Sequence, residues 1–342
     1  MNPTNPTNPT NPMNPIDPIY RQAFAAQQLM ATHPPRPTDT NKHLIFGLTC
    51  RPDIVHAGQI HVSRWPGVDL PPLISRYEDL PAFQGRGGFF TYEPPKPGWM
   101  DWHVNFAHWD LFAYYDGPLF AQDEMQVTEH PALASVRHVL LDGGLSTLTM
   151  EGRGPTPILI AGVERRCAIA TEPDPARGRP QGLYGNYFAQ ADRWALVAAT
   201  KLLDPPTVSN ILAMEAPANG RGRYTETQLR AILTTAYTGF RAVMAESQHL
   251  RGSEIRTAVH TGYWGCGAYG GNRVLMPLLQ MLAAAAAGIS ALIFYAGADR
   301  EPHQVARMHL DDLLPPGASV PTELLIRQIL AAGYRWGVGD GT

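Results

Sequence analysis

Short apolar runs alternate along the chain with segments in which apolar residues recur at helical spacing. The apolar runs predict strands at residues 43–50, 157–162, 194–200, 255–260 and 290–295. The periodic segments predict helices at residues 19–32, 132–141, 225–244, 273–287, 303–313 and 321–332. Thr225 and Gln228 form a capping-box pattern at the start of one helix, and Gly288 follows another as a C-terminal cap. Strands alternating with helices predict an α/β fold of packed layers.

Segments rich in Pro and Gly separate these elements and set the expected domain limits. Residues 65–100, 172–193 and 204–224 are predicted to be loops, and QGRGGFFTY (84–92) favours a turn over a ligand loop. The chain begins with the Asn-Pro-Thr repeat NPTNPTNPTNP, in which proline removes backbone donors. We expect residues 1–40 to be a disordered tail and linker, and residues 41–342 to form a single catalytic domain.

One stretch, residues 102–130, combines an apolar extended segment, a loop broken by Gly117 and Pro118, and the acidic start of a helix. Asp123 and Glu124 fall in the predicted first helical turn, where the helix dipole favours negative charge. That stabilisation alone explains acidic residues at most helix starts. Two adjacent carboxylates behind a glycine loop and among aromatic residues also suit an acid/base site, in which one carboxyl protonates a leaving glycosidic oxygen.

A second candidate is the strand–loop–helix unit at residues 255–287, whose loop TGYWGCGAYGGN contains five glycines. Backbone amides of such a loop, together with a helix N-terminus, can bind an anion such as phosphate. A tight turn packed under Trp264 is the equally weighted alternative. The loop matches neither the Walker pattern nor GxGxxG.

Composition excludes several function classes. The net charge of −3 and the pI near 6.5 do not indicate general binding to nucleic acids or to membrane surfaces. No apolar run approaches the length of a membrane helix. Three widely spaced cysteines form neither a zinc pattern nor a disulfide framework, and the histidines show no metal spacing. We therefore expect no metal, no cofactor and no secretory signal, and a cytoplasmic location. The oligomeric state stays open.

The segment TGYWGCGAYGGNRVLMPLLQMLAAAAAGISALIFYAG joins a glycine loop, an Ala-rich helix and an apolar strand. It resembles the pattern TGNWGCGAFGGD of the poly(ADP-ribose) glycohydrolases, with the Ala-rich helix and strand that follow it there, and the resemblance covers residues 85–315. WALVAAT and ILTTAYTGF resemble IVAIDA and LNKAYCGF, and VNFAH resembles VDFAN. DGPLFAQDE falls where the family has a glycine-rich diphosphate loop that ends in QEE. The resemblance implies a macrodomain-like mixed sheet flanked by helices, here with an N-terminal extension, and cleavage of ribose–ribose O-glycosidic bonds.

The resemblance also implies roles for individual residues. Glu124 corresponds to the catalytic acid/base and Asp123 to the carboxylate that holds the ribose. The remaining matched positions are expected to bind substrate, and they are Gln122 at the adenosine end, Tyr269 against the distal ribose, Asn105 and His108 on the VDFAN-like segment, Gly117 in the first loop, and Gly267, Ala268 and Gly270 in the second phosphate loop.

The chain departs from the family pattern at three places. Tyr115-Asp116-Gly117-Pro118 replaces the triple-glycine loop, where Asp116 would repel a diphosphate and Pro118 lacks a donor. Asn105 and His108 replace the Asp and Asn of VDFAN, and Tyr263 replaces the Asn of TGNWG. We therefore expect an ADP-ribosyl O-glycohydrolase that acts on poly(ADP-ribose) or a smaller conjugate, with ADP-ribosylated protein among the candidate partners. The alternatives are a non-catalytic ADP-ribose-binding module and a hydrolase of a free NAD-like nucleotide-sugar.

Overall fold

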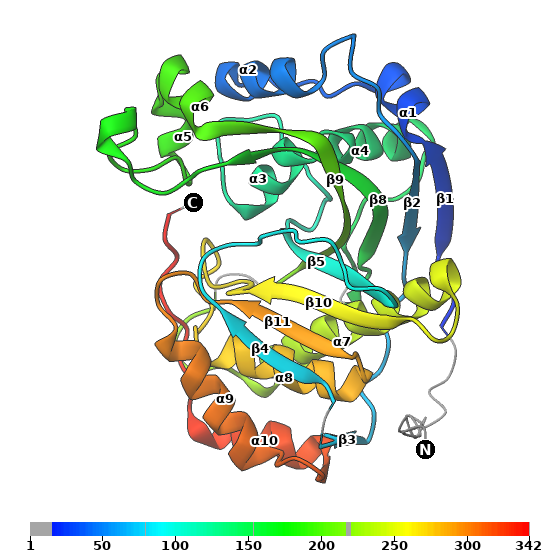
Figure 1. The fold of residues 1–342 in the computed structure, drawn as a ribbon. Coiled ribbons are helices and arrows are strands. Elements are labelled where there is room, and N and C mark those ends of the chain that lie inside the picture. Colours follow the sequence, from blue (N-terminus) through cyan, green and yellow to red (C-terminus); the bar gives the residue numbers. More distant parts are fainter. Residues whose placement is uncertain (1–15, 79, 153, 217–219, 342) are drawn as a thin grey trace, which may run out of the picture.

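The computed structural model describes residues 16–78, 80–152, 154–216 and 220–341. Its centre is a mixed eight-stranded sheet with the order β1-β2-β8-β9-β5-β10-β11-β4 (Figure 1). One half of the sheet is parallel: β9 (Thr200–Glu215), β5 (Trp99–Ala107), β10 (Arg256–Gly262), β11 (Ala291–Tyr295) and β4 (Ala82–Arg86). The other half is antiparallel: β1 (Tyr20–Ala25), β2 (Gln59–Arg64) and β8 (Ile158–Ile169).

Helices α7 (Glu226–Arg251) and α8 (Leu275–Ala287) cover one face of the sheet, and the main hydrophobic core lies between these helices and the strands. Helix α8 is buried almost all round, because α9 (Glu301–Leu313) packs against its outer side. Helix α10 (Thr322–Ala332) packs against α7. Because α8 lies between the sheet and α9, the Ala-rich segment has few polar residues on any side.

A second core covers the opposite face of the sheet's antiparallel half. It is built with α1 (Ala26–Thr32), α4 (Ala132–Asp142) and the apolar side of α3 (Gln122–Glu129). A third cluster joins α2 (Thr40–Thr49), α5 (Tyr187–Gln190) and α6 (Arg193–Ala199) above the far ends of β8 and β9 (Figure 1). The remaining short elements are β3 (Leu73–Ser75) paired with β12 (Ser319–Pro321), β6 (Met150–Glu151) paired with β7 (Gly154–Pro155), and the 3₁₀ turn η1 (Pro175–Arg177).

Most of the predicted elements are confirmed within a few residues. The extended segment at 102 is β5, the acidic helix begins at Gln122, and the glycine loop joins β10 to α8. The capping box of Thr225 and Gln228 is formed, and Gly288 ends α8 in the left-handed conformation. The mixed α/β architecture expected from the alternation of strands and helices is also confirmed.

Two predicted strands are wrong, because both segments are helices. Residues 43–49 lie in α2, which Cys50 follows as the C-cap, and the N-cap Asp39 accepts hydrogen bonds from the amides of Asn41 and Lys42. Residues 194–199 lie in α6, where Leu196 and Ala199 are buried while Trp194 is exposed, which is a helical pattern. Short apolar runs do not distinguish a buried strand from a buried helix, and the cap and the tertiary packing decided both cases.

The segment predicted as a loop at 204–224 is wrong in its first half, since β9 extends to Glu215. Pro205 and Pro206 interrupt the pairing with β8 at a point where the register shifts, so the missing amide donors are tolerated there. The helix predicted at 19–32 is confirmed only for α1, because residues 20–25 pair with β2 as strand β1. Residues 1–15 of the predicted tail lie outside the described residues, and the domain boundary near residue 40 stays a prediction.

Candidate active site

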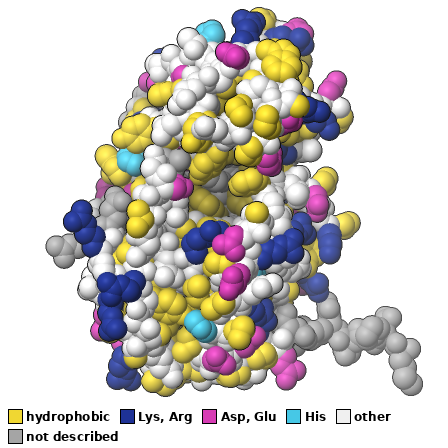
Figure 2. Space-filling view, turned by 90° about the vertical axis from the view of Figure 1, so that its left-hand side faces the viewer, with side chains coloured by type: hydrophobic (Ala, Val, Ile, Leu, Met, Phe, Trp, Pro, Cys, Tyr) yellow, Lys and Arg dark blue, Asp and Glu magenta, His cyan; other side chains and the backbone are white. Residues whose placement is uncertain are grey.

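A cavity of about 1050 Å³ opens where the parallel strands end. The residues that follow β4, β5, β9, β10 and β11 all contribute to its lining, through Gly88, His108, Ala216, Tyr263 and Ala296. Ligands of open α/β sheets bind in the crevice outside the carboxyl ends of the strands. Figure 2 shows the hollow on this face, with hydrophobic side chains around it and charged side chains below it.

The first turn of α3 places two carboxyl groups in this cavity. Asp123 and Glu124 line the cavity, and both side chains are almost fully buried. Asn105 on β5 donates from Nδ2 to Asp123 Oδ1 over 3.0 Å, and the Ala121 amide donates to Glu124 Oε2 over 3.0 Å. Each carboxyl group therefore has one oxygen held by the protein, which fixes the orientation of both.

Burial in this cavity favours the protonated form of both carboxyl groups. Desolvation, together with the neighbouring Glu124, raises the pKa of Asp123 to about 8, against the opposing hydrogen bond from Asn105. Desolvation also raises the pKa of Glu124, and the nearby charge of Lys42 opposes this shift. Because the two groups are adjacent, they titrate as a pair, and the pair retains a proton at neutral pH. This is the state that a general acid requires.

Lys42 on α2 brings a buried positive charge toward this pair. Its side chain has no exposed surface, and Nζ lies 3.5 Å from the carbonyl oxygen of Tyr114. Burial lowers the pKa of Lys42 to about 8, although Glu124 and three aspartates favour its charged form. The sequence did not single out this residue, because one Lys in a short apolar run carries no signal of its role.

The glycine loop between β10 and α8 forms the wall opposite α3. Its Trp264 is buried and donates from Nε1 to the carbonyl oxygen of Met214 on β9 over 3.0 Å, which ties the loop to the sheet. The amides of Gly270 and Gly271 donate to the carbonyls of Gly267 and Gly265, respectively. Two of the loop's amide donors are therefore used in hydrogen bonds within the loop itself. Gly265 and Gly270 have φ of +74° and +67°, a conformation that favours glycine.

Tyr269 projects from the glycine loop toward the strand ends. Its hydroxyl donates to Glu215 at the end of β9 over 3.3 Å. Burial raises the pKa of Glu215 to about 6 and also raises the pKa of Tyr269. This contact with Glu215 fixes the direction of the Tyr269 ring at the cavity wall.

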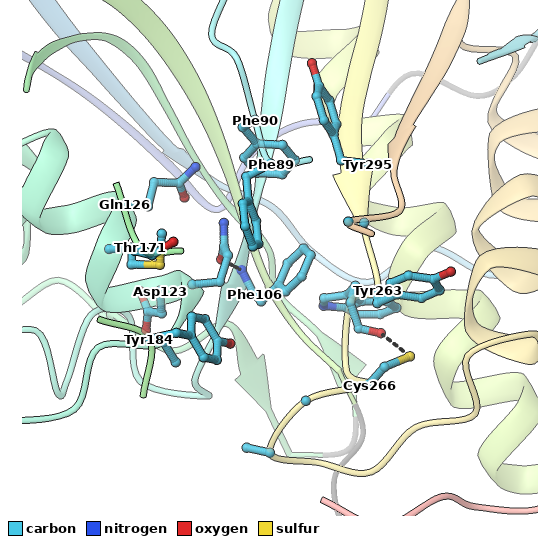
Figure 3. A pocket seen from close by; sticks show the side chains of 18 of the residues that line it. Phe89, Phe90, Phe106, Asp123, Gln126, Thr171, Tyr184, Tyr263, Cys266 and Tyr295 are labelled. Carbon is cyan, nitrogen blue, oxygen red and sulfur yellow. Dashed lines mark hydrogen bonds between the residues drawn. The ribbon is translucent and has the colours of Figure 1, made fainter. Parts of the chain in front are cut away.

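Aromatic rings from the loop after β4 and from the end of β5 line the cavity. Figure 3 shows Phe89, Phe90 and Phe106 between the α3 side and the side of Tyr263 and Tyr295. Phe90 packs edge-on against Tyr295, with ring centroids 5.2 Å apart, while Phe89 is about half exposed. The structure brings this FF pair, which the sequence predicts to be part of a turn, into the cavity. The sequence feature that could have indicated this role is the pair of aromatic residues directly after Gly87 and Gly88.

A buried ion pair lines the far side of the cavity. Arg165 on β8 donates from Nε to Glu129 Oε2 over 2.8 Å, and its guanidinium lies 4.4 Å from the centroid of the Tyr92 ring. Glu129 also accepts a hydrogen bond from the Ile169 amide. Nothing in the local sequence pattern singles out this pair, because its partners lie 36 residues apart.

Most of the predicted site residues are brought together. Seven of them line the cavity: His108, Gln122, Asp123, Glu124, Gly267, Ala268 and Tyr269. The side-chain amide of Gln122 accepts from the Phe106 amide and donates to the Val104 carbonyl, so it holds the start of α3 on β5. His108 packs its ring against Trp109 and Tyr114.

Three predicted residues lie outside the cavity lining. Asn105 lies behind Asp123 and acts through the hydrogen bond to it. Gly270 packs against the backbone of residues 337–339. Gly117 belongs to a turn whose neighbour Asp116 accepts hydrogen bonds from the amides of Thr38 and Asp39, so this turn joins the N-terminal segment to the site region.

Among the residues that the structure describes, no group of three or more His, Cys, Asp or Glu side chains could hold a metal ion. Within the same residues, no helix is both long enough and apolar enough to cross a membrane.

Comparison with known proteins gives a family model described as poly(ADP-ribose) glycohydrolase, macro domain fold, which matches residues 184–304. Among solved structures, the poly(ADP-ribose) glycohydrolase of Thermomonospora curvata is 14% identical, with 84% of this chain and 85% of that chain covered and a TM-score of 0.42. Its complex with the inhibitor ADP-HPD is 15% identical, with 84% of each chain covered and a TM-score of 0.42.

The poly(ADP-ribose) glycohydrolase of Deinococcus radiodurans in complex with ADP-ribose is 14% identical, with 86% of this chain and 94% of that chain covered and a TM-score of 0.39. Likenesses this distant assign no role to any residue of the cavity. The family match does include β10, the glycine loop, α8 and β11, which carry one wall of the cavity. Over residues 184–304, the chain is similar to the family model described as poly(ADP-ribose) glycohydrolase, macro domain fold.

Proposed function

We propose that this protein is an ADP-ribosyl O-glycohydrolase and that Glu124 is its general acid and base. The observation that carries the proposal is the buried pair of Asp123 and Glu124, which faces a cavity whose opposite wall is the glycine loop of the family-matched segment. A cavity of about 1050 Å³ has room for a ligand of nucleotide size. Poly(ADP-ribose) and single ADP-ribosyl conjugates are both candidate substrates, and the expected cytoplasmic location stays a prediction.

In the first step, the protonated carboxyl of Glu124 donates its proton to the glycosidic oxygen. The bond between the anomeric carbon and that oxygen breaks, the leaving group departs as an alcohol, and positive charge develops on the ribose as an oxocarbenium-like ion. Burial supports this role, because it raises the pKa of Glu124 and so favours the protonated acid. Asp123, held by Asn105, is placed to accept hydrogen bonds from ribose hydroxyls.

In the second step, the Glu124 carboxylate removes a proton from a water molecule that attacks the anomeric carbon. The products are ADP-ribose and the free hydroxyl of the leaving group, and Glu124 returns to its protonated form. The hydrogen bond from the Ala121 amide holds one carboxyl oxygen throughout. The same group can therefore act twice without moving.

The test is release of ADP-ribose, quantified by mass spectrometry, from polymeric and single-unit ADP-ribosylated acceptors. In Glu124→Gln the amide keeps the side-chain shape and can still accept from Ala121, but it cannot transfer a proton. We expect the release rate to fall by about 10²–10⁴-fold. Glu254→Gln, on the exposed surface before β10, is the matched control and should keep the wild-type rate.

The other outcomes separate the alternatives. If the wild type binds ADP-ribose in calorimetry but releases none from either acceptor, the protein is a non-catalytic ADP-ribose-binding module. Turnover of soluble NAD-related compounds alone would assign it to small-molecule metabolism. Equal rates for Glu124→Gln and wild type would refute the role of Glu124.

A further inference from the structure

The segment after α10 turns back across the glycine loop. Figure 1 shows it passing beside the loop that follows β10 and ending near α5. The Gly337 amide donates to the Gly270 carbonyl over 2.8 Å, and the Asp340 amide donates to the Gly267 carbonyl over 3.4 Å. Near its end, Gly341 accepts a hydrogen bond from Asn186 before α5. The segment therefore bridges both sides of the cavity mouth.

Trp336 anchors this segment in the core. Its ring stacks on Tyr224 with centroids 4.3 Å apart, its backbone amide donates to the Gly222 carbonyl, and its Nε1 donates to Gln228 Oε1. Only 9% of Trp336 is exposed. The position of residues 337–340 over the loop is thus set by a buried aromatic residue beside them.

Two glycines allow the segment to lie directly on the loop. A Cβ at Gly339 would stand 2.5 Å from the Ala268 carbonyl oxygen, and one at Gly337 would stand 3.3 Å from that of Gly270. Any side chain at residue 339 would push the segment away from the loop. The GVGDG sequence at 337–341 is therefore shaped to fit the loop backbone.

This fit brings the carboxylate of Asp340 against Gly267. A Cβ at Gly267 would stand 3.2 Å from Asp340 Oδ2, and both Asp340 and Val338 line the cavity. The carboxylate thus lies at the loop from which the family resemblance expects amide donors for a diphosphate. A phosphate bound to this loop would have a negative charge as its neighbour.

The other charged groups of the lining are mainly acidic. The two guanidinium groups of the lining are both ion-paired already, Arg165 with Glu129 and Arg273 with Asp299 over 3.2 Å. The carboxyl groups of the lining are Asp123, Glu124, Glu129, Glu172, Asp299 and Asp340. An anionic ligand therefore meets more negative than positive groups in this cavity.

We propose that Asp340 is a specificity-determining residue of the site, whose carboxylate competes with the diphosphate of a ligand for the glycine loop. The inference rests on the proposed function, because it takes the ligand to be an ADP-ribosyl compound. Its effect is selective: the charge weakens the binding of anionic ligands and leaves the binding of uncharged nucleosides unaltered. The carboxylate must be displaced, neutralised or shielded before a diphosphate takes its place.

The experiment compares three ligands by calorimetry: inorganic pyrophosphate, ADP-ribose and uncharged adenosine. Asp340→Asn keeps the shape of the side chain and removes its charge, so we expect both anions to bind about tenfold more tightly, with adenosine unchanged. The gain should shrink at high ionic strength. Asp340→Glu keeps the charge and should bind like the wild type. Asp312→Asn on exposed α9 changes the net charge equally and is the matched control.

Equal affinity of wild type and Asp340→Asn for both anions would overturn the inference. An equal gain in affinity for adenosine would overturn it too, because it would indicate that the substitution had loosened the C-terminal segment. It would be overturned too if neither protein bound pyrophosphate or ADP-ribose, or if Asp340→Glu behaved like Asp340→Asn. These measurements concern binding alone. Absence of glycohydrolase turnover, with tighter anion binding retained in Asp340→Asn, would refute the proposed function while this inference stood.

Discussion

Replacing Lys42 with methionine tests how the protein accommodates a buried charge beside its candidate catalytic carboxyls. Methionine keeps an unbranched stem of similar length and removes the ammonium group. Lys42 is fully buried, whereas the other two lysines, Lys96 and Lys201, are exposed. The variant therefore removes one charge from the interior and nothing from the surface.

The magnitude follows from the shifted pKa. Burial lowers the pKa of Lys42 from 10.5 to about 8, and at 1.36 kcal/mol per pKa unit the buried charge is disfavoured by about 3 kcal/mol. Below pH 8, both the folded and the unfolded chain carry the proton, and this penalty is present in full. Between pH 8 and pH 10.5, the folded state has released the proton and the unfolded state still holds it, so folding stability rises with pH.

The assay is urea unfolding of wild type and Lys42→Met at a series of pH values. Other titrating groups contribute to both proteins, and subtraction removes most of their effect. The difference in unfolding free energy, wild type minus variant, should rise by about 3 kcal/mol from pH 8 to pH 10.5. Loss of the Lys42 charge also raises the pKa of Asp123 and Glu124, which adds to the rise in the same direction.

Lys96→Met is the matched control, since its exposed charge should give a flat difference curve. A flat curve for Lys42→Met would refute the reasoning, because it would mean that the Lys42 ammonium group is as well solvated in the folded protein as in the unfolded chain.

Two further predictions concern the carboxyl pair and the sheet. Because glycosidic cleavage needs a proton on the pair of Asp123 and Glu124, and burial raises the pKa of Asp123 to about 8, the rate should fall as pH rises through about 8; a constant rate across this range would contradict the acid role. Gly162 has φ of +85°, and a Cβ there would stand 2.4 Å from the Gln59 carbonyl oxygen, so Gly162→Ala should lower the unfolding free energy by about 3 kcal/mol in urea denaturation. Gly47→Ala in α2, where a Cβ meets nothing within 4 Å, should leave stability equal or slightly raised, and equal stabilities for the two variants would contradict the clash.

Local signals in the sequence were sufficient for the elements that carry the predicted chemistry. The acidic residues after a Gly-Pro break marked the start of α3, and the glycine-rich run before an apolar helix marked the loop between β10 and α8. These signals act within one or two turns of the chain, because caps, dipoles and backbone φ values depend on nearest neighbours. The residues they identified, from Asp123 to Tyr269, do meet in one cavity.

Local signals failed where packing decides the structure. The runs that form α2 and α6 are short and apolar, and only their cap and their buried face distinguish them from strands. The turn at Gly117 looked like a ligand loop by position in the family pattern, but its backbone is bonded to the segment before α2. The cap of α2 is local, but the buried faces of both helices and the turn at Gly117 depend on residues far away in the sequence.

The sequence by itself determined the α/β class, the acidic helix start, the glycine loop and the family resemblance. The tertiary structure alone decided that five strands from distant parts of the chain end at one cavity, and that Phe89, Arg165, Lys42 and Asp340 reach or adjoin it. It also decided the upward pKa shifts of the carboxyl pair, because desolvation depends on what surrounds a side chain in three dimensions. The order of strands in a sheet is set by long-range packing, and the pattern of a single segment does not indicate which other segments will lie beside it in space.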